Sequence, residues 1–425
     1  GSEMCIRDRG IEDQAVNTWT PGDVENPYAE MVDIANRFAH ETTNSNVKGD
    51  ITITANGIAD GSGNVNLYFG NKEEGFITTG GNLTVTGTGD VFVDSDLDIG
   101  GNLTLNGTGA DSEVVLDITN IGQVQAKNEL AKNPASQVTA AEKLHQFMHH
   151  FSNTNGDGAN IYLNAKNSND TKITVDMWDG NAFNLNKFDS KDHNFKNELD
   201  SMNVTVNGKK LGETGNNHVK DYTYIWVSSG EQLKDIQTYY DDHKNDEGGT
   251  GILSYNFALK GDINASDVED YVAIGTGNKD ASGNEIGFTG TFDGRGNRII
   301  GLKVENANGN AGIFDTIGTN GVVKDVNIYS GTFTGSKNAG AVAGVNNGRI
   351  EGIVTFGNTV TSNGNTLTSK GNAGGIVGVN NSGNFSKNET TGSTNDGILT
   401  GGIYDVESTG SVIAGSSSAV AGGLV

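Results

Sequence analysis

Cysteine and proline are almost missing from this chain of 425 residues, which contains one cysteine and three prolines. A disulfide framework is excluded, because a single cysteine has no partner within the chain. Collagen is excluded as well, since its triple helix needs a proline-rich Gly-X-Y period. A very low cysteine content is common in exported repetitive proteins that must stay unfolded during translocation.

Positive charge is also scarce, with 28 Lys and Arg against 53 Asp and Glu, which gives a net charge of −25. Nucleic acids and anionic lipids bind clustered basic residues, so neither is expected as a partner. No apolar run of about 18 residues is present, so no membrane span is expected, and the start of the chain shows no signal peptide. We favour a self-repelling, soluble surface over a specific cation-binding role.

Glycine is abundant, at 62 residues, and it separates short β-branched runs such as 51–54 (ITIT) and 322–328 (VVKDVNI). A disordered chain would lack such runs. Runs of this kind between turn residues are typical of strands, so the sequence predicts a turn-rich all-β protein.

A short sequence motif, which we call the recurring phrase, occurs several times in the last third of the chain. Its full copies begin at Asn338 (NAGAVAGVNNG) and Asn372 (NAGGIVGVNNSG), a weaker copy begins at Asn310 (NAGIF), and Ala421 opens a last, interrupted copy. Self-similarity at spacings of roughly 30 to 50 residues is typical of a solenoid, whose repeats bury their apolar faces against their neighbours. We therefore predict an all-β fold, a right-handed parallel β-helix.

A shorter period supports this prediction earlier in the chain. Residues 80–89 (GGNLTVTGTG) recur at 100–109 (GGNLTLNGTG), 20 residues later, which is close to one coil of a β-helix. Between the two copies, apolar and polar residues alternate from Val91 to Ile99, so one set is expected to face the core and the other the solvent.

Three short helical insertions interrupt the predicted strands, near 27–40, 136–152 and 229–243. The first follows Pro27, and the second combines a Thr139/Glu142 capping box with an apolar stripe. For the third, we expect a capping box formed by Ser228 and Glu231. Its expected buried face consists of Leu233, Ile236, Tyr239 and Tyr240.

The chain divides into six predicted segments. Residues 1–9, which include the single cysteine Cys5, resemble a translated adapter read-through and are set aside as an artefact. Because the last copy of the phrase is interrupted, we expect the chain to be an internal fragment. The remaining segments are a helical and irregular region at 10–46, β-helix coils at 47–125, an insertion with a helix and short strands at 126–221, a helical junction at 222–250 and repeats at 251–425, truncated at the C-terminus.

Two groups of residues are candidates for binding metal. His145 and His149 lie one helical turn apart, as in zinc proteases, but Gln146 stands where such a protease has its glutamate base. We therefore favour a helix whose Phe147 and Met148 pack while the histidines face water. Asp94, Asp96 and Asp98 begin like a calcium loop.

The later positions of the calcium-loop pattern do not match, because Ile99 and Leu105 replace the required glycine and glutamate. An outward row of carboxylates on one strand explains the three aspartates better, with calcium bridging of that row left open. We expect no cofactor.

No motif for catalysis is complete, so we do not expect an enzyme. The segment 288–298 (FTGTFDGRGNR) lacks the third glycine and the helix of a dinucleotide site, and Asp293-Gly294 is interpreted as a turn between two coils. The aromatic residues near the third helix could stack on sugars, but core packing is favoured; they are Tyr222, Tyr224, Trp226, Tyr239 and Tyr240.

The recurring Asn-Ala-Gly-Gly-Ile-Val-Gly phrases resemble the GLUG repeat of bacterial surface exoproteins and of the stalks of some secreted metallopeptidases. The run from Tyr224 (YIWVSSGEQL) through 261–266 (GDINAS) to 288–297 (FTGTFDGRGN) is similar to filamentous-haemagglutinin-like adhesins, which are secreted by the two-partner route. Together the resemblance covers about residues 47–125 and 222–425.

This resemblance implies an internal shaft fragment of a large adhesin, secreted or at the bacterial cell surface, that attaches to host or matrix glycans or proteins. It also implies an outer-membrane transporter as partner. Neither the secretion domain of such adhesins nor a peptidase zinc motif is recognisable in the chain.

Two alternatives stay open: a β-helical polysaccharide-active enzyme, and the GLUG stalk of a secreted metallopeptidase. The enzyme would need carboxylates that converge beside a basic residue, and Arg295, Arg298 and Arg349 are among the few arginines of the coil region.

Overall fold

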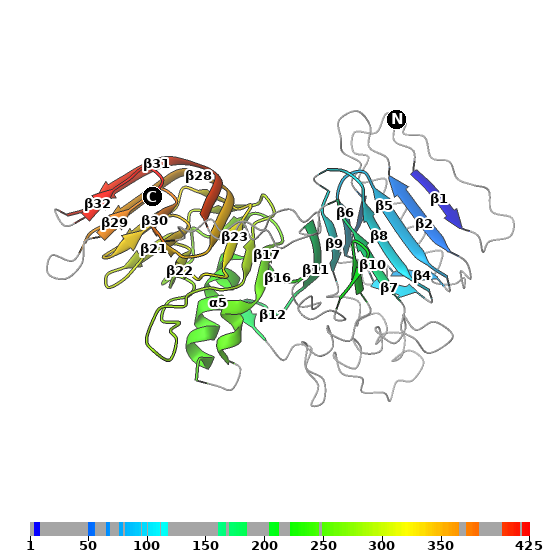
Figure 1. Ribbon diagram of the computed structural model, residues 1–425, viewed down its shortest axis with the longest axis horizontal. Helices are drawn as coiled ribbons and strands as arrows, with labels where there is room; N and C mark the ends of the chain where they lie inside the picture. Colours follow the sequence, from blue (N-terminus) through cyan, green and yellow to red (C-terminus); the bar gives the residue numbers. More distant parts are fainter. Residues whose placement is uncertain are drawn as a thin grey trace, which may run out of the picture. The chain divides into compact units, whose positions relative to one another are not determined.

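The structure is a computed structural model of the chain. It describes residues 4–8, 50–55, 65–68, 76–79, 81–94, 96–99, 101–110, 112–117, 160–166, 170–184, 204–211, 222–245, 249–364, 371–381, 402–416 and 419–425. These residues form mostly β-structure with long parallel sheets and the helix α5 (Figure 1). They divide into one unit of residues 1–175 and 185–224, and a second of residues 176–184 and 225–425.

Five strands of one sheet in the first unit run parallel and lie side by side (Figure 1). They are β2 (Ile51–Ala55), β5 (Leu83–Gly87), β8 (Leu103–Gly107), β10 (Ile161–Asn164) and β14 (Val204–Val206). Alternate residues of β2, β5 and β8 are buried. The register aligns Ile51, Leu83, Leu103, Ile161 and Val204 in one fully buried row. Burying such a row removes apolar surface from water at each new strand.

Between these strands, the chain passes through further parallel sheets. One contains β3 (Val65–Tyr68), β6 (Val91–Asp94), β9 (Val114–Asp117) and β11 (Thr171–Val175). Another pairs β4 (Phe76–Thr79) with β7 (Asp96–Ile99). We call each passage of the chain through these sheets a coil. The order β2-β3-β4 followed by β5-β6-β7 is compatible with a parallel β-helix.

A ladder of amide side chains joins the coils of the first unit at the start of the strands β2, β5, β8 and β10. The Oδ1 atom of Asp50 accepts hydrogen bonds from the backbone N (2.9 Å) and Nδ2 (3.0 Å) of Asn82. Asn82 Oδ1 in turn accepts from the backbone N of Asn102 at 2.8 Å, and Asn102 Oδ1 from that of Asn160 at 3.1 Å. The recurring Gly-Gly-Asn-Leu-Thr motif therefore supplies one rung of a polar ladder beside each buried leucine.

Further strands extend the sheets of the first unit on both sides. Met4–Asp8 forms β1, which pairs antiparallel with β2, although residues 1–9 were set aside as an artefact. The edge of a sheet offers unpaired backbone groups that an extended segment can bond. β10, β11 and β14 lie where short strands were expected within the 126–221 insertion, and they extend the sheets of 47–125. β15 (Lys209–Lys210) then forms a hairpin with β14.

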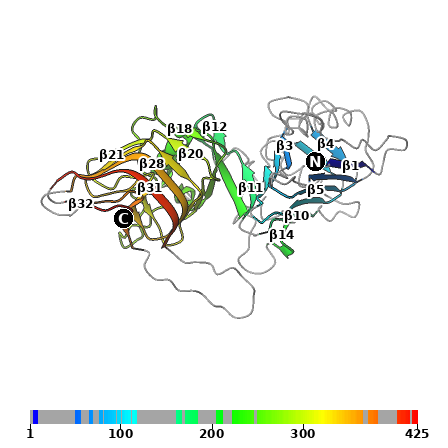
Figure 2. The same ribbon diagram turned by 90° about the horizontal axis from the view of Figure 1, so that it is seen from above.

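The second unit repeats this arrangement. One row of parallel strands contains β17 (Asn256–Leu259), β19 (Thr291–Asp293), β23 (Val322–Lys324), β28 (Arg349–Ser362) and β31 (Gly402–Ala414). A second contains β18 (Ile263–Asn264), β20 (Arg298–Ile300) and β24 (Asn327–Tyr329), followed by the middle of β28. A third contains β21 (Lys303–Asn306) and β25 (Thr332–Gly335), and β25 also pairs with the end of β28. Figure 2 shows β28 and β31 side by side.

Left-handed residues align where the coils of the second unit turn. Lys324, Glu351 and Tyr404 are in register, and the residue after each has a positive φ: 52° at Asp325, 61° at Gly352 and 46° at Asp405. A second such row, at 56–76°, contains Gly301, Ser330 and Gly357. This conformation costs a non-glycine residue about 1–2 kcal/mol. The aligned corners therefore show that the stacking of the coils imposes the turn.

The copies of the recurring phrase form two short sheets. One sheet consists of β26 (Asn338–Ala339), β29 (Gly371–Ala373) and β32 (Ala419–Ala421). The other consists of β22 (Phe314–Ile317), β27 (Ala343–Asn346) and β30 (Val377–Asn380). Ala311, Ala339, Ala373 and Ala421 are partners in register, so the copies identified in the sequence lie on top of one another. Asparagines join them, because Asn338 Nδ2 donates to Asn310 Oδ1 (3.1 Å) and Asn372 Nδ2 to Asn338 Oδ1 (2.9 Å).

Helix α5 (Gly230–His243) is present where a helix was predicted near 229–243, but its cap differs from the prediction by one residue. Ser229 is the N-cap, and its Oγ accepts from the backbone N of Gln232 at 3.1 Å. Gln232 Oε1 accepts from the backbone N of Ser228 at 2.8 Å, so Gln232 replaces Glu231 as the reciprocal partner. The expected helices near 27–40 and 136–152 lie outside the described residues.

A hairpin and a 3-10 turn surround α5. The hairpin, β12 (Trp178–Asp179) and β13 (Ala182–Phe183), contacts the helix where the backbone N of Phe183 donates to Asp235 Oδ2 at 2.7 Å. The turn η3 (Gly249–Ser254) leads into β17, and β16 (Thr223–Val227) precedes the helix. Leu233, Ile236 and Tyr240 are buried as predicted, whereas Tyr239 is only half-buried.

Candidate functional site

The predicted metal ligands fall in different places. Asp94 ends β6, while Asp96 and Asp98 lie on β7, which pairs with a different strand, so the single strand expected over 91–99 is two strands. The three aspartates are therefore divided between two strands, β6 and β7. His145 and His149 lie outside the described residues. Within the described part of the chain, no group of three or more His, Cys, Asp or Glu side chains is placed to hold a metal ion.

The arginines that an enzyme could use are engaged by neighbours in the coils. Arg298 pairs with Asp262 of the preceding coil, with Nε 3.0 Å and Nη2 2.6 Å from Asp262 Oδ2. This pairing lowers the pKa of Asp262, chiefly through the side-chain hydrogen bond from Arg298. Arg349 pairs with Glu351, two residues along the same strand, and Arg295 lies over the ring of Trp226 at 5.2 Å. Each arginine thus has a different partner.

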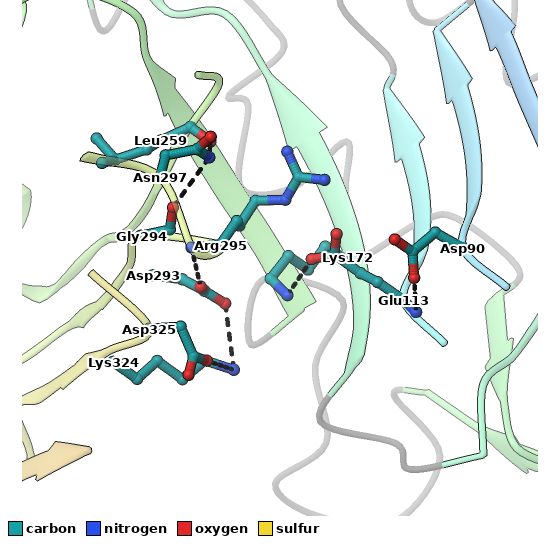
Figure 3. A network of polar contacts seen from close by, with 10 residues as sticks. All are labelled: Asp90, Glu113, Lys172, Leu259, Asp293, Gly294, Arg295, Asn297, Lys324 and Asp325. Atoms are coloured by element: carbon teal, nitrogen blue, oxygen red, sulfur yellow. Dashed lines mark hydrogen bonds and ion pairs between the residues drawn. The ribbon is translucent and has the colours of Figure 1, made fainter. Parts of the chain in front are cut away.

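Asp293 forms a buried ion pair between coils (Figure 3). Its Oδ2 lies 3.1 Å from Lys324 Nζ, which is also 3.8 Å from Asp325 Oδ2. Its Oδ1 accepts from the backbone N of Arg295 at 2.8 Å, which holds Arg295 at a φ of 51°. The expected turn between two coils is therefore a corner within one coil, between β19 and β20.

A second buried pair belongs to the first unit. Lys172 Nζ lies 2.5 Å from Glu113 Oε1, and Lys172 is almost fully buried (Figure 3). The ammonium group also lies 5.5 Å from the centre of the Tyr224 ring. The backbone N of Glu113 donates to Asp90 Oδ1 at 2.8 Å. Like the Asp293 pair, this arrangement links neighbouring coils through charge, and pairing offsets part of the cost of burying it.

A buried carboxylate without a cationic partner in contact lies at Asp315 in β22. Burial raises the pKa of Asp315, while hydrogen bonds from Thr316 Oγ1 (3.0 Å) and Asn310 Nδ2 (3.3 Å) lower it by a smaller amount. In the next coils, Gly344 and Gly378 occupy its register position. Asp315 is therefore an exception in a row of glycines.

The aromatic residues near α5 serve the core. Tyr224, Trp226 and Tyr240 are buried, which confirms the packing interpretation for these three. Trp178 Nε1 donates to the backbone O of Trp226, and the ring of Phe183 meets that of Tyr239 edge to face at 4.9 Å. The buried rings of Tyr224, Trp226 and Tyr240 therefore present no face to a sugar.

One outward row was missed by the sequence reasoning. Asn264, Ile300, Tyr329 and Phe356 are register partners on β18, β20, β24 and β28. Phe356 is 57% exposed, and its ring centre lies 5.6 Å from that of Tyr329. Each member directly follows a buried residue, but the coils differ in length, so the alignment of the row is hidden in the sequence.

Comparison with known proteins gives one distant similarity. A segment of 97 residues, 23% of this chain, is 35% identical to a segment of halomucin from Haloquadratum walsbyi. That segment is 1% of halomucin, so the chain matches a very small part of a much larger protein. No family model and no solved structure matches the chain. The resemblance to GLUG and filamentous-haemagglutinin-like families thus gains no support from a family match.

The described helices include none that is long and apolar enough to cross a lipid bilayer.

Proposed function

We propose that the chain is a shaft segment of a large secreted adhesin at a bacterial cell surface. Its two units are taken as right-handed parallel β-helices that hold adhesive regions away from the cell. The in-register stacking of the recurring phrase carries this proposal, because coils that contact only their neighbours extend a shaft by simple addition. The similarity of a short segment to a very large protein supports it.

The proposal includes attachment to host or matrix glycans or proteins, export by the two-partner route with an outer-membrane transporter, and no enzymatic activity. The engaged arginines support the last point. The main alternative, a polysaccharide-active enzyme, predicts that the purified chain shortens acidic polysaccharides, as measured by size-exclusion chromatography. Shortening at catalytic amounts of protein would reject the adhesin proposal.

A shaft should tolerate the removal of whole coils. Thr291, Val322 and Arg349 occupy one register position, so deleting residues 291–348 joins the chain at equivalent points. We expect this variant, attached to beads, to keep a cooperative thermal transition and the wild-type adhesion to cultured cells and matrix glycans. Deleting residues 291–349 shifts the register by one residue and turns the later side chains to the wrong face, so this control should misfold.

Absence of adhesion by wild-type beads and by the full-length protein would count against the adhesin proposal. Equal behaviour of the two deletions would count against the shaft.

A further inference from the structure

The outward row of residues on β18, β20, β24 and β28 begins at Asn264. Asn264-Ala265-Ser266 is an Asn-X-Ser sequence, the acceptor motif for N-linked sugars. Asn264 and Ser266 are both exposed. Asn264 Oδ1 accepts from the backbone N (3.1 Å) and Oγ (2.8 Å) of Ser266, so these bonds stay within the motif.

Other motifs of this type in the described residues are committed to the ladders between coils. Asn82 Nδ2 donates to Asp50, and Asn106 Nδ2 donates to Thr86 Oγ1 at 3.0 Å. Asn102 stands between Asn82 and Asn160 in the ladder, and Asn380 Oδ1 accepts from Asn346 Nδ2 at 2.9 Å. A sugar on Asn82 or Asn106 would break the bond that its amide makes to the next coil.

The surface beside Asn264 suits an attached oligosaccharide. Ile300, Tyr329 and Phe356 follow it on successive strands, which lie about 4.8 Å apart, so the row extends for about 14 Å. Pyranose rings carry C–H groups that pack on aromatic faces. Asp262 and Arg298, each two residues before a member of the row and about half exposed, place a carboxylate and a guanidinium beside it.

We propose that Asn264 is an N-glycosylation site whose glycan lies along the row Ile300, Tyr329 and Phe356. An oligosaccharyltransferase would join Asn264 Nδ2 to C1 of the first sugar of a lipid-diphosphate-linked oligosaccharide. The C1–O bond to the diphosphate breaks, the lipid diphosphate leaves, and Nδ2 gives up one proton. The proposal rests on the proposed export of the chain, since the acceptor must meet the transferase across a membrane.

The test uses the full chain made in two hosts, a eukaryotic secretory host that glycosylates and a bacterial host without a transferase. Peptide mass spectrometry of the secreted protein should show glycan on most Asn264 and on little of Asn82, Asn102 or Asn106. The Ser266→Ala variant keeps the asparagine and should lose the glycan. Folded secreted protein with sugars on Asn82 or Asn106 and none on Asn264 would overturn the proposal.

The position of the glycan is tested by thermal unfolding of the same two preparations. The glycosylated wild-type chain should melt a few degrees above the unglycosylated chain, and Phe356→Ala should reduce that difference by at least half. The exposed Ile413→Ala serves as the matched control and should leave the difference unchanged. An equal difference in all three proteins would show that the sugar does not lie on the row. The deletion and adhesion tests above do not depend on either result.

Discussion

Single residues decide how closely the coils approach one another, and the glycines of the recurring phrase show this most directly. A Cβ on Gly340 would lie 2.4 Å from the backbone O of Ala343 and 2.5 Å from that of Ile376. Gly374 is similarly crowded by Val377 O at 2.1 Å. Because these neighbours are backbone atoms, they have no rotamer by which to move away.

We expect Gly340→Ala to lower the free energy of unfolding by about 1–3 kcal/mol, the usual cost of overpacking. Gly261→Ala is the matched control, since its added Cβ meets no atom within 4 Å and φ there lies outside the left-handed region. Urea denaturation of both variants measures the difference. Equal losses in the two would show that the phrase glycines do not mark close contacts.

The buried carboxyl of Asp315 makes the stability of the folded protein depend on pH. Its pKa is raised in the folded state, so the folded protein binds the proton more tightly than the unfolded chain does. The stability that this proton contributes is fully present below the unfolded pKa, near 3.8, and is lost as the pH rises through the folded value.

Asp315→Asn removes the charge while it keeps the shape, so it should be more stable than wild type at pH 7, and the advantage should shrink toward pH 4. Lys337 and Glu285 also influence this carboxyl and stay unchanged in the comparison. Denaturation midpoints across this pH range measure the effect. A constant difference at every pH would contradict it.

Among the elements, α5 shows what local sequence rules can and cannot decide. Its existence and its buried Leu233 and Ile236 follow from helical spacing, and both were predicted. The cap was misplaced because adjacent serines, Ser228 and Ser229, are each followed three residues later by a side chain that can complete a capping box. Only the path of the chain out of β16 makes Ser229 the cap and Gln232 its partner.

Ser229→Ala should therefore destabilise the second unit by about 1 kcal/mol, a typical cost for a lost N-cap. Ser228→Ala should change stability little, because Gln232 bonds the backbone N of Ser228 and not its side chain. Thermal unfolding followed by circular dichroism compares the two variants. A larger loss in Ser228→Ala would restore the cap expected from the sequence.

For the strands as well, part of the arrangement could be predicted from the sequence and part could not. The alignment of Ala311, Ala339 and Ala373 was predictable, because identical small residues recur beside glycine. The corner row of Asp325, Gly352 and Asp405 was not, because unlike residues share one conformation there. The outward aromatic row was missed for a related reason, since the irregular coil lengths conceal which residues become neighbours.

At the scale of the whole molecule, the proposed shaft depends on parallel coils stacked in a fixed register. Thr332 of β25 and Thr359 of β28 are register partners, and Thr361 lies two residues further along β28. All three side chains are half-buried. The register partners should have Cα atoms about 4.8 Å apart, within the range that a disulfide spans, while Thr332 and Thr361 should be about 8 Å apart, outside it.

The decisive measurement is disulfide formation between engineered cysteine pairs in a Cys5→Ser background. Under mild oxidation the Thr332→Cys/Thr359→Cys protein should cross-link rapidly, as seen by its faster migration on a denaturing, non-reducing gel. The Thr332→Cys/Thr361→Cys protein should stay largely reduced under the same conditions. Equal cross-linking of both pairs, or faster cross-linking of the second, would contradict the stacked, in-register coils of the proposed shaft.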